Sequence, residues 1–237
     1  MTTFALVHGA WHGAWCWERV APLLEARGHR VLTLDLPCDD ATATFATYAD
    51  VVVTALDTSG TDDVVVVGHS LAGHTIPLVA DRRPVRRLIY LCALVAMPGH
   101  SFAEQLELEP DALLPEYRAG ISEPDEAART RWVDEDVARS VFYADCTAED
   151  ARAAFERLRP QAQTPFTQPC PLTGFPPVPR TYVVCSEDRI VNADRGRSVA
   201  RGRLEADLVE LPGSHSPFLS RPADLANVLH HQAQLAD

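Results

Sequence analysis

The sequence pattern with the most evident chemistry is GHSLAG at residues 68–73, which directly follows an apolar run. A serine among small residues, placed after a strand and before a helix, is typical of a nucleophile elbow, where a sharp turn exposes the hydroxyl above a sheet. The close approach of the strand and helix backbones favours Gly68, whereas Ala72 adds one methyl group to the usual glycine. The alternative is an ordinary strand–turn–helix junction, but the context favours a nucleophilic Ser70.

A serine hydroxyl becomes a good nucleophile only beside a base that takes its proton, and that base needs an acid to orient it. Asp188 and His215 each follow an apolar run later in the chain, which gives the order serine, acid, histidine. The carboxyl ends of parallel strands lie along one side of the sheet, which we call the sheet edge. We therefore predict a catalytic triad of Ser70, His215 and Asp188 there. Glu187 is the nearest rival acid, and the alternatives are a helix-capping Asp188 and a surface-loop His215.

The first apolar run ends in a turn of small residues that could stabilise the negative charge of such a reaction. Attack on a carbonyl places that charge on oxygen, where backbone N–H groups can meet it. We expect the N–H of Ala10 in this turn and the N–H of Leu71 to form this oxyanion hole. We also expect aromatic residues to line the substrate pocket, with Trp11 and His12 at its mouth and Trp132 from a later segment.

Six short apolar segments predict the sheet that these turns require. The first five are rich in β-branched residues and hardly alternate with polar ones, which is typical of parallel strands buried on both faces. The sixth alternates and is therefore expected at an edge. Stretches with helical spacing separate them, so the pattern predicts an α/β fold with a roughly six-stranded, mostly parallel sheet covered by helices on both faces. The segments are 4–7, 30–34, 64–67, 87–92, 181–185 and 206–211.

The alternation of strands and helices stops between residues 98 and 179. This stretch has no clear strand but shows helical spacing, for example at 147–158. Its last part, 160–179, contains seven prolines and is expected to be mostly extended loop. We interpret residues 98–179 as a helical cap with a proline-rich return segment, inserted into a core formed by residues 1–97 and 180–237.

Composition argues against several other classes of function. The chain has 237 residues and a net charge of −12, and all 21 of its cationic side chains are arginines. An acidic chain without a basic stretch is a poor partner for nucleic acid or an anionic membrane, and the lack of lysine removes Schiff-base and P-loop chemistry. The six cysteines show no CxxC pair and no zinc-site spacing, so we expect reduced thiols, no metal and no cofactor.

The expected location follows from what the sequence lacks. Its longest apolar stretch, 88–97, is too short to span a bilayer, and the first residues show no basic region of a signal peptide. We therefore expect a cytoplasmic protein. The sequence leaves open whether it works as a homodimer.

These motifs resemble the α/β-hydrolase superfamily. The opening VHGAWHGAWCW at 7–17, PLLEA and GH within 22–29, and SED at 186–188 are similar to the plant methylesterase and hydroxynitrile lyase branch and its bacterial esterase-like relatives. The resemblance covers both ends of the chain and is weak across the cap. Two departures are Ala72 and Cys38, where many relatives have glycine.

The resemblance implies a serine hydrolase that cleaves a small carboxylic ester, or a related thioester or lactone, through an acyl-enzyme. Its partner would be that small-molecule ester. A hydroxynitrile lyase, a cyclase-type pathway enzyme and a ligand-binding protein on the same fold are the alternatives. In the plant lyases, threonine and lysine occupy the positions of Gly9 and Ser216, and this chain has no lysine at all. These departures favour the esterase over the plant-type lyase.

Overall fold

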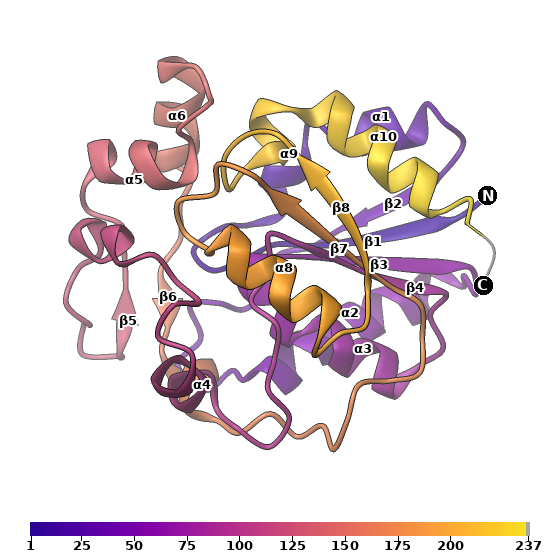
Figure 1. Ribbon diagram of the computed structural model, residues 1–237, viewed down its shortest axis with the longest axis horizontal. Helices are drawn as coiled ribbons and strands as arrows, with labels where there is room; N and C mark the ends of the chain where they lie inside the picture. The colour runs from indigo at the N-terminus through magenta and orange to yellow at the C-terminus, as the bar shows by residue number, and fades with distance from the viewer. Residues whose placement is uncertain (236–237) are drawn as a thin grey trace.

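The computed structural model describes residues 1–235, and a six-stranded sheet forms its centre (Figure 1). The strands are β1 Thr3–Val7, β2 Arg30–Thr33, β3 Val64–His69, β4 Arg87–Leu91, β7 Arg180–Cys185 and β8 Asp207–Leu211. Their order is β2-β1-β3-β4-β7-β8, and every neighbouring pair is parallel. All six predicted segments are strands of this sheet, and the alternating one, β8, lies at an edge as expected. The predicted α/β fold is confirmed.

The valine run of β3 shows why the central strands are apolar on both faces. Val64 belongs to one core cluster together with side chains of helix α2 (Phe45–Ser59), whereas Val65 belongs to a second cluster with side chains of α10 (Pro222–Gln232). All four valines of 64–67 are fully buried. Successive side chains of a strand point to opposite faces, so a sheet covered on both sides needs apolar residues at every position.

Helices cover both faces of the sheet. Side chains of α2, α3 and α8 pack into the first cluster, and those of η1, α1, α9 and α10 pack into the second. Figure 1 shows α1 and α10 together on one side and α2 with α3 on the other. The additional bounds are η1 Ala14–Trp17, α1 Ala21–Glu25, α3 Ile76–Arg82, α8 Ala193–Arg201 and α9 Pro217–Ser220.

Local sequence fixes both ends of the long helix α2. At its N-terminus, the side chains of Thr44 and Thr47 form a capping box that satisfies backbone N–H groups of the first turn. At its C-terminus, Gly60 adopts a φ of +63°, a left-handed conformation that glycine takes without a steric penalty. Residues within or next to the helix therefore cap both of its ends.

Residues 98–179 add no strand to the six-stranded sheet. Their elements gather beside the sheet edge toward which the strands point (Figure 1). They are α4 Phe102–Leu108, η3 Pro115–Gly120, β5 Arg129–Thr130, α5 Glu135–Phe142, α6 Ala148–Phe155, β6 Gln161–Ala162 and α7 Thr164–Thr167. We call this segment the cap.

The cap, in which the sequence shows no clear strand, contains a small two-stranded sheet. Strands β5 and β6 pair in an antiparallel manner, with Arg129 opposite Ala162 and Thr130 opposite Gln161. Two residues per strand are too few to produce a readable alternation, which explains why the sequence did not reveal them.

In the described part of the chain, no helix is long and apolar enough to cross a membrane.

Candidate active site

Ser70 lies at a sharp turn at the carboxyl end of β3. The strand ends at His69, and the 3-10 helix η2 (Ser70–His74) begins at the serine itself. The φ of Ser70 is +53°, in the left-handed region, which is strained for a residue with a side chain and persists only where the surroundings enforce it. Ser70 lines the large cavity under the cap. The turn thus presents the serine as a nucleophile elbow does.

The glycines beside Ser70 show where the backbones approach most closely. A Cβ on Gly68 would lie 2.7 Å from a methyl group of Ile76, and a Cβ on Gly73 would overlap the carbonyl oxygen of Leu94. Ala72 is buried and its methyl group is accommodated. The steric demand therefore falls on positions 68 and 73, which explains how the chain can depart from the usual glycine at position 72.

Asp188 and His215 meet at the same sheet edge as Ser70. Asp188 follows β7, His215 follows β8, and His215 Nδ1 lies 2.7 Å from Asp188 Oδ2. The other carboxylate oxygen of Asp188 accepts backbone N–H groups of Ile190 at 2.8 Å and Val191 at 3.0 Å. Asp188 is therefore fixed by its own loop while it orients the histidine. The rival acid, Glu187, is exposed.

The second ring nitrogen of His215 is left free for chemistry. Because Nδ1 donates its hydrogen to Asp188, Nε2 of the neutral ring is the acceptor. His215 is fully buried, and its Nε2 has no hydrogen-bond partner within residues 1–235. A buried acceptor without a partner is costly, so this atom is suited to receive a proton from a neighbouring donor.

His69, the residue before the serine, holds the backbone of His215 through a hydrogen bond. His69 Nε2 donates to the backbone carbonyl of His215 at 2.9 Å, and the two ring centroids lie 4.6 Å apart. Burial lowers the pKa of His69 well below its ordinary value, with the nearby His215 as the next cause. A neutral His69 at neutral pH places no competing charge beside the base.

The predicted oxyanion residues, Ala10 and Leu71, both line the cavity. Leu71 is the second residue of η2, so its N–H has no acceptor within that helix. The peptide that carries the Ala10 N–H is held by His8, whose Nδ1 donates to the carbonyl of Gly9 at 2.8 Å. His8 Nε2 accepts the N–H of Leu36 at 3.0 Å, which fixes this tautomer, and burial lowers the pKa of His8 to about 4.

His12 does not line the cavity, in contrast to its predicted place at the mouth. It is fully buried, its Nδ1 donates to the carbonyl of Ala10 at 2.8 Å, and its Nε2 accepts the hydroxyl of Tyr143 at 3.0 Å. Both nitrogens are therefore used within the protein. His12 connects the turn at Ala10 to the end of cap helix α5.

Trp132 also differs from its predicted role as a lining residue. It is buried behind Trp11 and Phe142, with ring centroids 5.9 Å and 4.7 Å away. Trp11 does line the cavity, and Phe142 takes the place that the sequence suggested for Trp132. The Phe142 ring lies 5.7 Å from that of His215. Only the apolar face of helix α5 could have indicated Phe142 in advance.

The cavity above Ser70 has a volume of about 440 Å³ and a mostly apolar wall. Most of its lining comes from the cap, in which the sequence offered few signals. Its polar groups are few, and the charged ones, Arg118 and Glu123, lie on exposed residues. The lining residues are Ala10, Trp11, Ser70, Leu71, Leu94, Phe102, Ala103, Leu106, Leu113, Tyr117, Arg118, Ile121, Ser122, Glu123, Thr130, Phe142, Gln163, Phe166, Thr167 and Ile190.

One group of potential metal ligands lies at the site. The ligand atoms of Cys92, Asp188 and His215 are within 4.8 Å of one another. Asp188 and His215 already bind each other, and burial raises the pKa of the Cys92 thiol well above its ordinary value. A protonated thiol is a poor metal ligand, so this group is better suited to proton transfer through His215 than to holding a cation.

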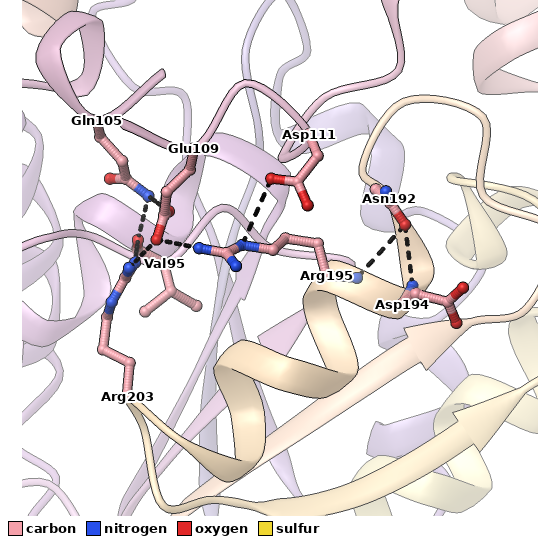
Figure 2. A network of polar contacts seen from close by, with 8 residues as sticks. All are labelled: Val95, Gln105, Glu109, Asp111, Asn192, Asp194, Arg195 and Arg203. Carbon is pink, nitrogen blue, oxygen red and sulfur yellow. Dashed lines mark hydrogen bonds and ion pairs between the residues drawn. The ribbon is translucent and has the colours of Figure 1, made fainter. Parts of the chain in front are cut away.

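An ionic network around the buried carboxylate of Glu109 joins the end of α4 to α8, the helix that follows the loop of Asp188 (Figure 2). Glu109, just after α4, binds both Arg195 of α8 and Arg203, and its second oxygen accepts Gln105 Nε2 at 3.0 Å. Burial alone would raise the pKa of Glu109, but its bonds to Arg203 and Gln105 and the charge of Arg195 outweigh that effect and lower it. Arg203 and Gln105 also bind the carbonyl of Val95.

This network fastens the base of the cap to the acid loop. Within the five residues after Glu109, Leu114 N donates to the carbonyl of Ile190 at 2.9 Å, and the carbonyl of Ala112 accepts the N–H of Asn192 at 3.1 Å. The two segments therefore lie side by side directly after Asp188. The loop that orients His215 is therefore hydrogen-bonded to the base of the cap.

A parallel sheet covered by helices on both faces, with Ser70 in a strained turn after β3, is typical of an α/β hydrolase, and comparison with known proteins agrees. The model of the alpha/beta hydrolase family matches residues 4–228. Methylesterase 2 from Arabidopsis thaliana is 30% identical over 99% of this chain and 95% of its own length. A pyrethroid hydrolase from Sphingobium wenxiniae is 31% identical over 97% of this chain and 86% of its own. The chain therefore belongs to the alpha/beta hydrolase family.

Solved structures agree with this assignment. The crystal structure of a pyrethroid hydrolase from Sphingobium faniae JZ-2 superposes with a TM-score of 0.83 and 28% identity, covering 98% of this chain and 97% of that one. The similarity spans the cap as well as the core. The protein is thus an enzyme of the hydrolase class, as the sequence predicted.

Proposed function

We propose that the protein hydrolyses carboxylic esters with an apolar body, using Ser70 as nucleophile, His215 as general base and Asp188 as the orienting acid. The observation that carries this proposal is the buried His215 ring, bonded to Asp188 on one nitrogen and free on the other, at the sheet edge where Ser70 meets the cavity. The names of relatives such as Methylesterase 2 support an ester as the substrate class.

The reaction would proceed in two halves. His215 Nε2 takes the hydroxyl proton as Ser70 Oγ attacks the ester carbonyl, and the N–H groups of Ala10 and Leu71 stabilise the oxygen that becomes negative. The C–O bond to the alcohol breaks, and His215 returns the proton to the leaving alkoxide. A water molecule, deprotonated by His215, then attacks the acyl-enzyme. The bond between the acyl carbon and Ser70 Oγ breaks, His215 returns the proton to Ser70 Oγ, and the carboxylic acid leaves.

The plant-type lyase alternative lacks support from the site. A Cβ on Gly9 would lie 2.8 Å from the Cβ of Ser70, so the turn is built around a residue without a side chain. Ser216, at the position of the lyase lysine, is fully buried. Gly9 therefore lacks the threonine hydroxyl, and Ser216 lacks the lysine cation, that the plant lyases have at these positions.

The decisive test is the Ser70→Ala variant on a panel of p-nitrophenyl and methyl esters of increasing acyl length. We expect kcat to fall by about 10⁴-fold or more, because no acyl-enzyme can form. Labelling of the wild-type protein by a fluorophosphonate should map to Ser70 and disappear in the variant. Ser140→Ala, an exposed serine on α5, is the matched control and should keep full activity. A folded Ser70→Ala protein that retains most of its esterase activity would refute the proposal.

A further inference from the structure

One polar position interrupts the apolar wall of the cavity. Thr130 on β5 lines the cavity and is only 7% exposed. Its hydroxyl oxygen accepts two hydrogen bonds, from Trp11 Nε1 at 3.2 Å and from Gln163 Nε2 at 3.2 Å. Trp11 and Gln163 line the same cavity. One core residue, Trp11, and one cap residue, Gln163, therefore both bind the hydroxyl group of Thr130 in the cap.

A count of hydrogens shows what this hydroxyl still offers. A threonine oxygen has two lone pairs and one hydrogen, and the donors of Trp11 and Gln163 use both lone pairs. The hydroxyl hydrogen must therefore be donated elsewhere, and no acceptor in residues 1–235 receives it. Because Thr130 is almost wholly enclosed apart from the cavity, an acceptor can reach that hydrogen only from the cavity.

This conclusion holds for either orientation of the Gln163 amide. If its oxygen and nitrogen were exchanged, Thr130 would donate to Gln163 Oε1, and the amide N–H groups would be left for the cavity instead. In both cases the pair keeps at least one donor without a protein acceptor. A bound molecule that reaches this position is therefore favoured if it presents an acceptor atom there.

The location of this donor relates it to the reaction. Trp11 directly follows Ala10, so the length of one indole side chain separates the donor from the oxyanion turn. Trp11 itself is held in a strained conformation with a φ of +60°, and its carbonyl accepts the N–H of Arg159 at 2.6 Å. The indole that frames Thr130 is therefore fixed from both the core and the cap.

We propose that Thr130, framed by Trp11 and Gln163, is a subsite that donates a hydrogen bond to an acceptor atom of the substrate remote from the scissile carbonyl. The substrate class is an apolar ester that carries one ether oxygen, carbonyl oxygen or ring nitrogen away from its ester group. The identification of the substrate as an ester rests on the proposed function, whereas the subsite itself does not.

The test measures binding without turnover, in the Ser70→Ala background. The probes are methyl esters of linear alkanoic acids and their analogues in which one methylene, moved along the chain, is replaced by an ether oxygen. Every ether oxygen loses water on entering the cavity, so the informative quantity is the ratio of Kd values between analogue and parent at each position. We expect a maximum of relative affinity at one position, and Thr130→Val should reduce that maximum by about 3- to 10-fold.

Controls separate the donor from mere packing. Thr130→Ser keeps the hydroxyl and should keep the maximum, and Gln163→Met should remove it only if the amide is the donor. A flat series in the Ser70→Ala protein, or the same ratios at every position after both Thr130→Val and Gln163→Met, would overturn the subsite. The flat-series criterion needs no Thr130 variant, so it stands even if Thr130→Val does not fold. If the wild-type protein hydrolyses no ester but the maximum is present, the proposed function fails and the subsite stands.

Discussion

The two walls of the cavity are built in different ways. The wall at the sheet edge consists of turns whose backbone is fixed locally, as by the left-handed φ of Ser70 and the two N–H groups that hold Asp188. The opposite wall belongs to the cap, and side chains such as Phe142 and Phe166 form it by packing. The first wall therefore suits chemistry, which needs fixed atoms, and the second suits recognition, which depends on shape.

Polar contacts join the two walls, and two of them lie close to the site. His12 joins the turn at Ala10 to Tyr143 of the cap, and the Glu109 network joins the end of α4 to α8 (Figure 2). If the comparison is correct, substitutions at the sheet edge should lower kcat, substitutions in the cap should change KM, and substitutions at the links should affect stability.

The largest effect is expected at the sheet edge itself. Asp188→Asn should lower kcat by roughly 10²–10⁴-fold, because the amide can no longer fix the tautomer of His215 in which Nε2 accepts the proton. Steady-state kinetics on the best ester of the panel measures this. Glu187→Gln, a change at the adjacent exposed acid, is the control and should leave kcat nearly unchanged. The assignment of the acid is wrong if Glu187→Gln proves the more damaging of the two.

The sheet-edge wall could be predicted from the sequence because its signals are local. Apolar runs that end in GHSLAG, in SED or in GSH mark both the strands and the turns that follow them. The structure places Ser70, Asp188 and His215 at one edge, with Ala10 and Leu71 beside the cavity.

The cap wall was not predictable in the same way, because its residues are selected by contacts between distant segments. His12 and Trp132 were expected in the pocket on the strength of residue type, yet each is enclosed by neighbours that only the tertiary structure brings together. Thr130 and Gln163 carry no motif, and the pairing of β5 with β6 that brings them near each other involves two residues per strand. The periodicity of apolar residues along a short segment does not predict such pairings between distant segments.

A link between the walls provides a second, smaller effect. Glu109→Gln removes the buried charge that neutralises Arg195 and Arg203, and it should lower the free energy of unfolding by about 2–4 kcal/mol. We place this below the full cost of a broken buried pair because both arginines are partly exposed to solvent. At about 2–4 °C per kcal/mol, thermal unfolding would show the loss directly.

The same variant tests how the link acts on the site. Leu106 and Leu113, on either side of Glu109, line the cavity, so KM should rise more than kcat falls. Asp111→Asn is the control, since that exposed carboxylate lies 3.9 Å from Arg195 and should contribute little. An unchanged melting temperature for Glu109→Gln would show that the network does not fasten the cap.

The smallest effect concerns His74, where the helix after the nucleophile meets the cap. Its ring stacks on Phe45 at 4.8 Å and contacts Phe102 of α4 edge-on at 5.1 Å. Burial, aided by the charge of Arg203, lowers the pKa of His74 from its ordinary 6.5 to about 3. The unfolded chain therefore takes up the proton first, so the contribution of His74 to stability is present above pH 6.5 and is lost as the pH falls toward 3.

Replacing His74 by phenylalanine removes this titration and keeps a ring in the stack. Between pH 7 and pH 5, one such histidine accounts for about 2 kcal/mol of lost stability, so His74→Phe should reduce the pH-dependent difference in unfolding free energy by about that amount. Chemical denaturation at the two pH values measures it. Phe45→Leu is the matched control, because it weakens the same stack without removing the titrating group and should lower stability equally at both pH values. If His74→Phe leaves the difference in unfolding free energy between pH 7 and pH 5 unchanged, protonation of His74 does not destabilise the contact of its ring with Phe45 and Phe102.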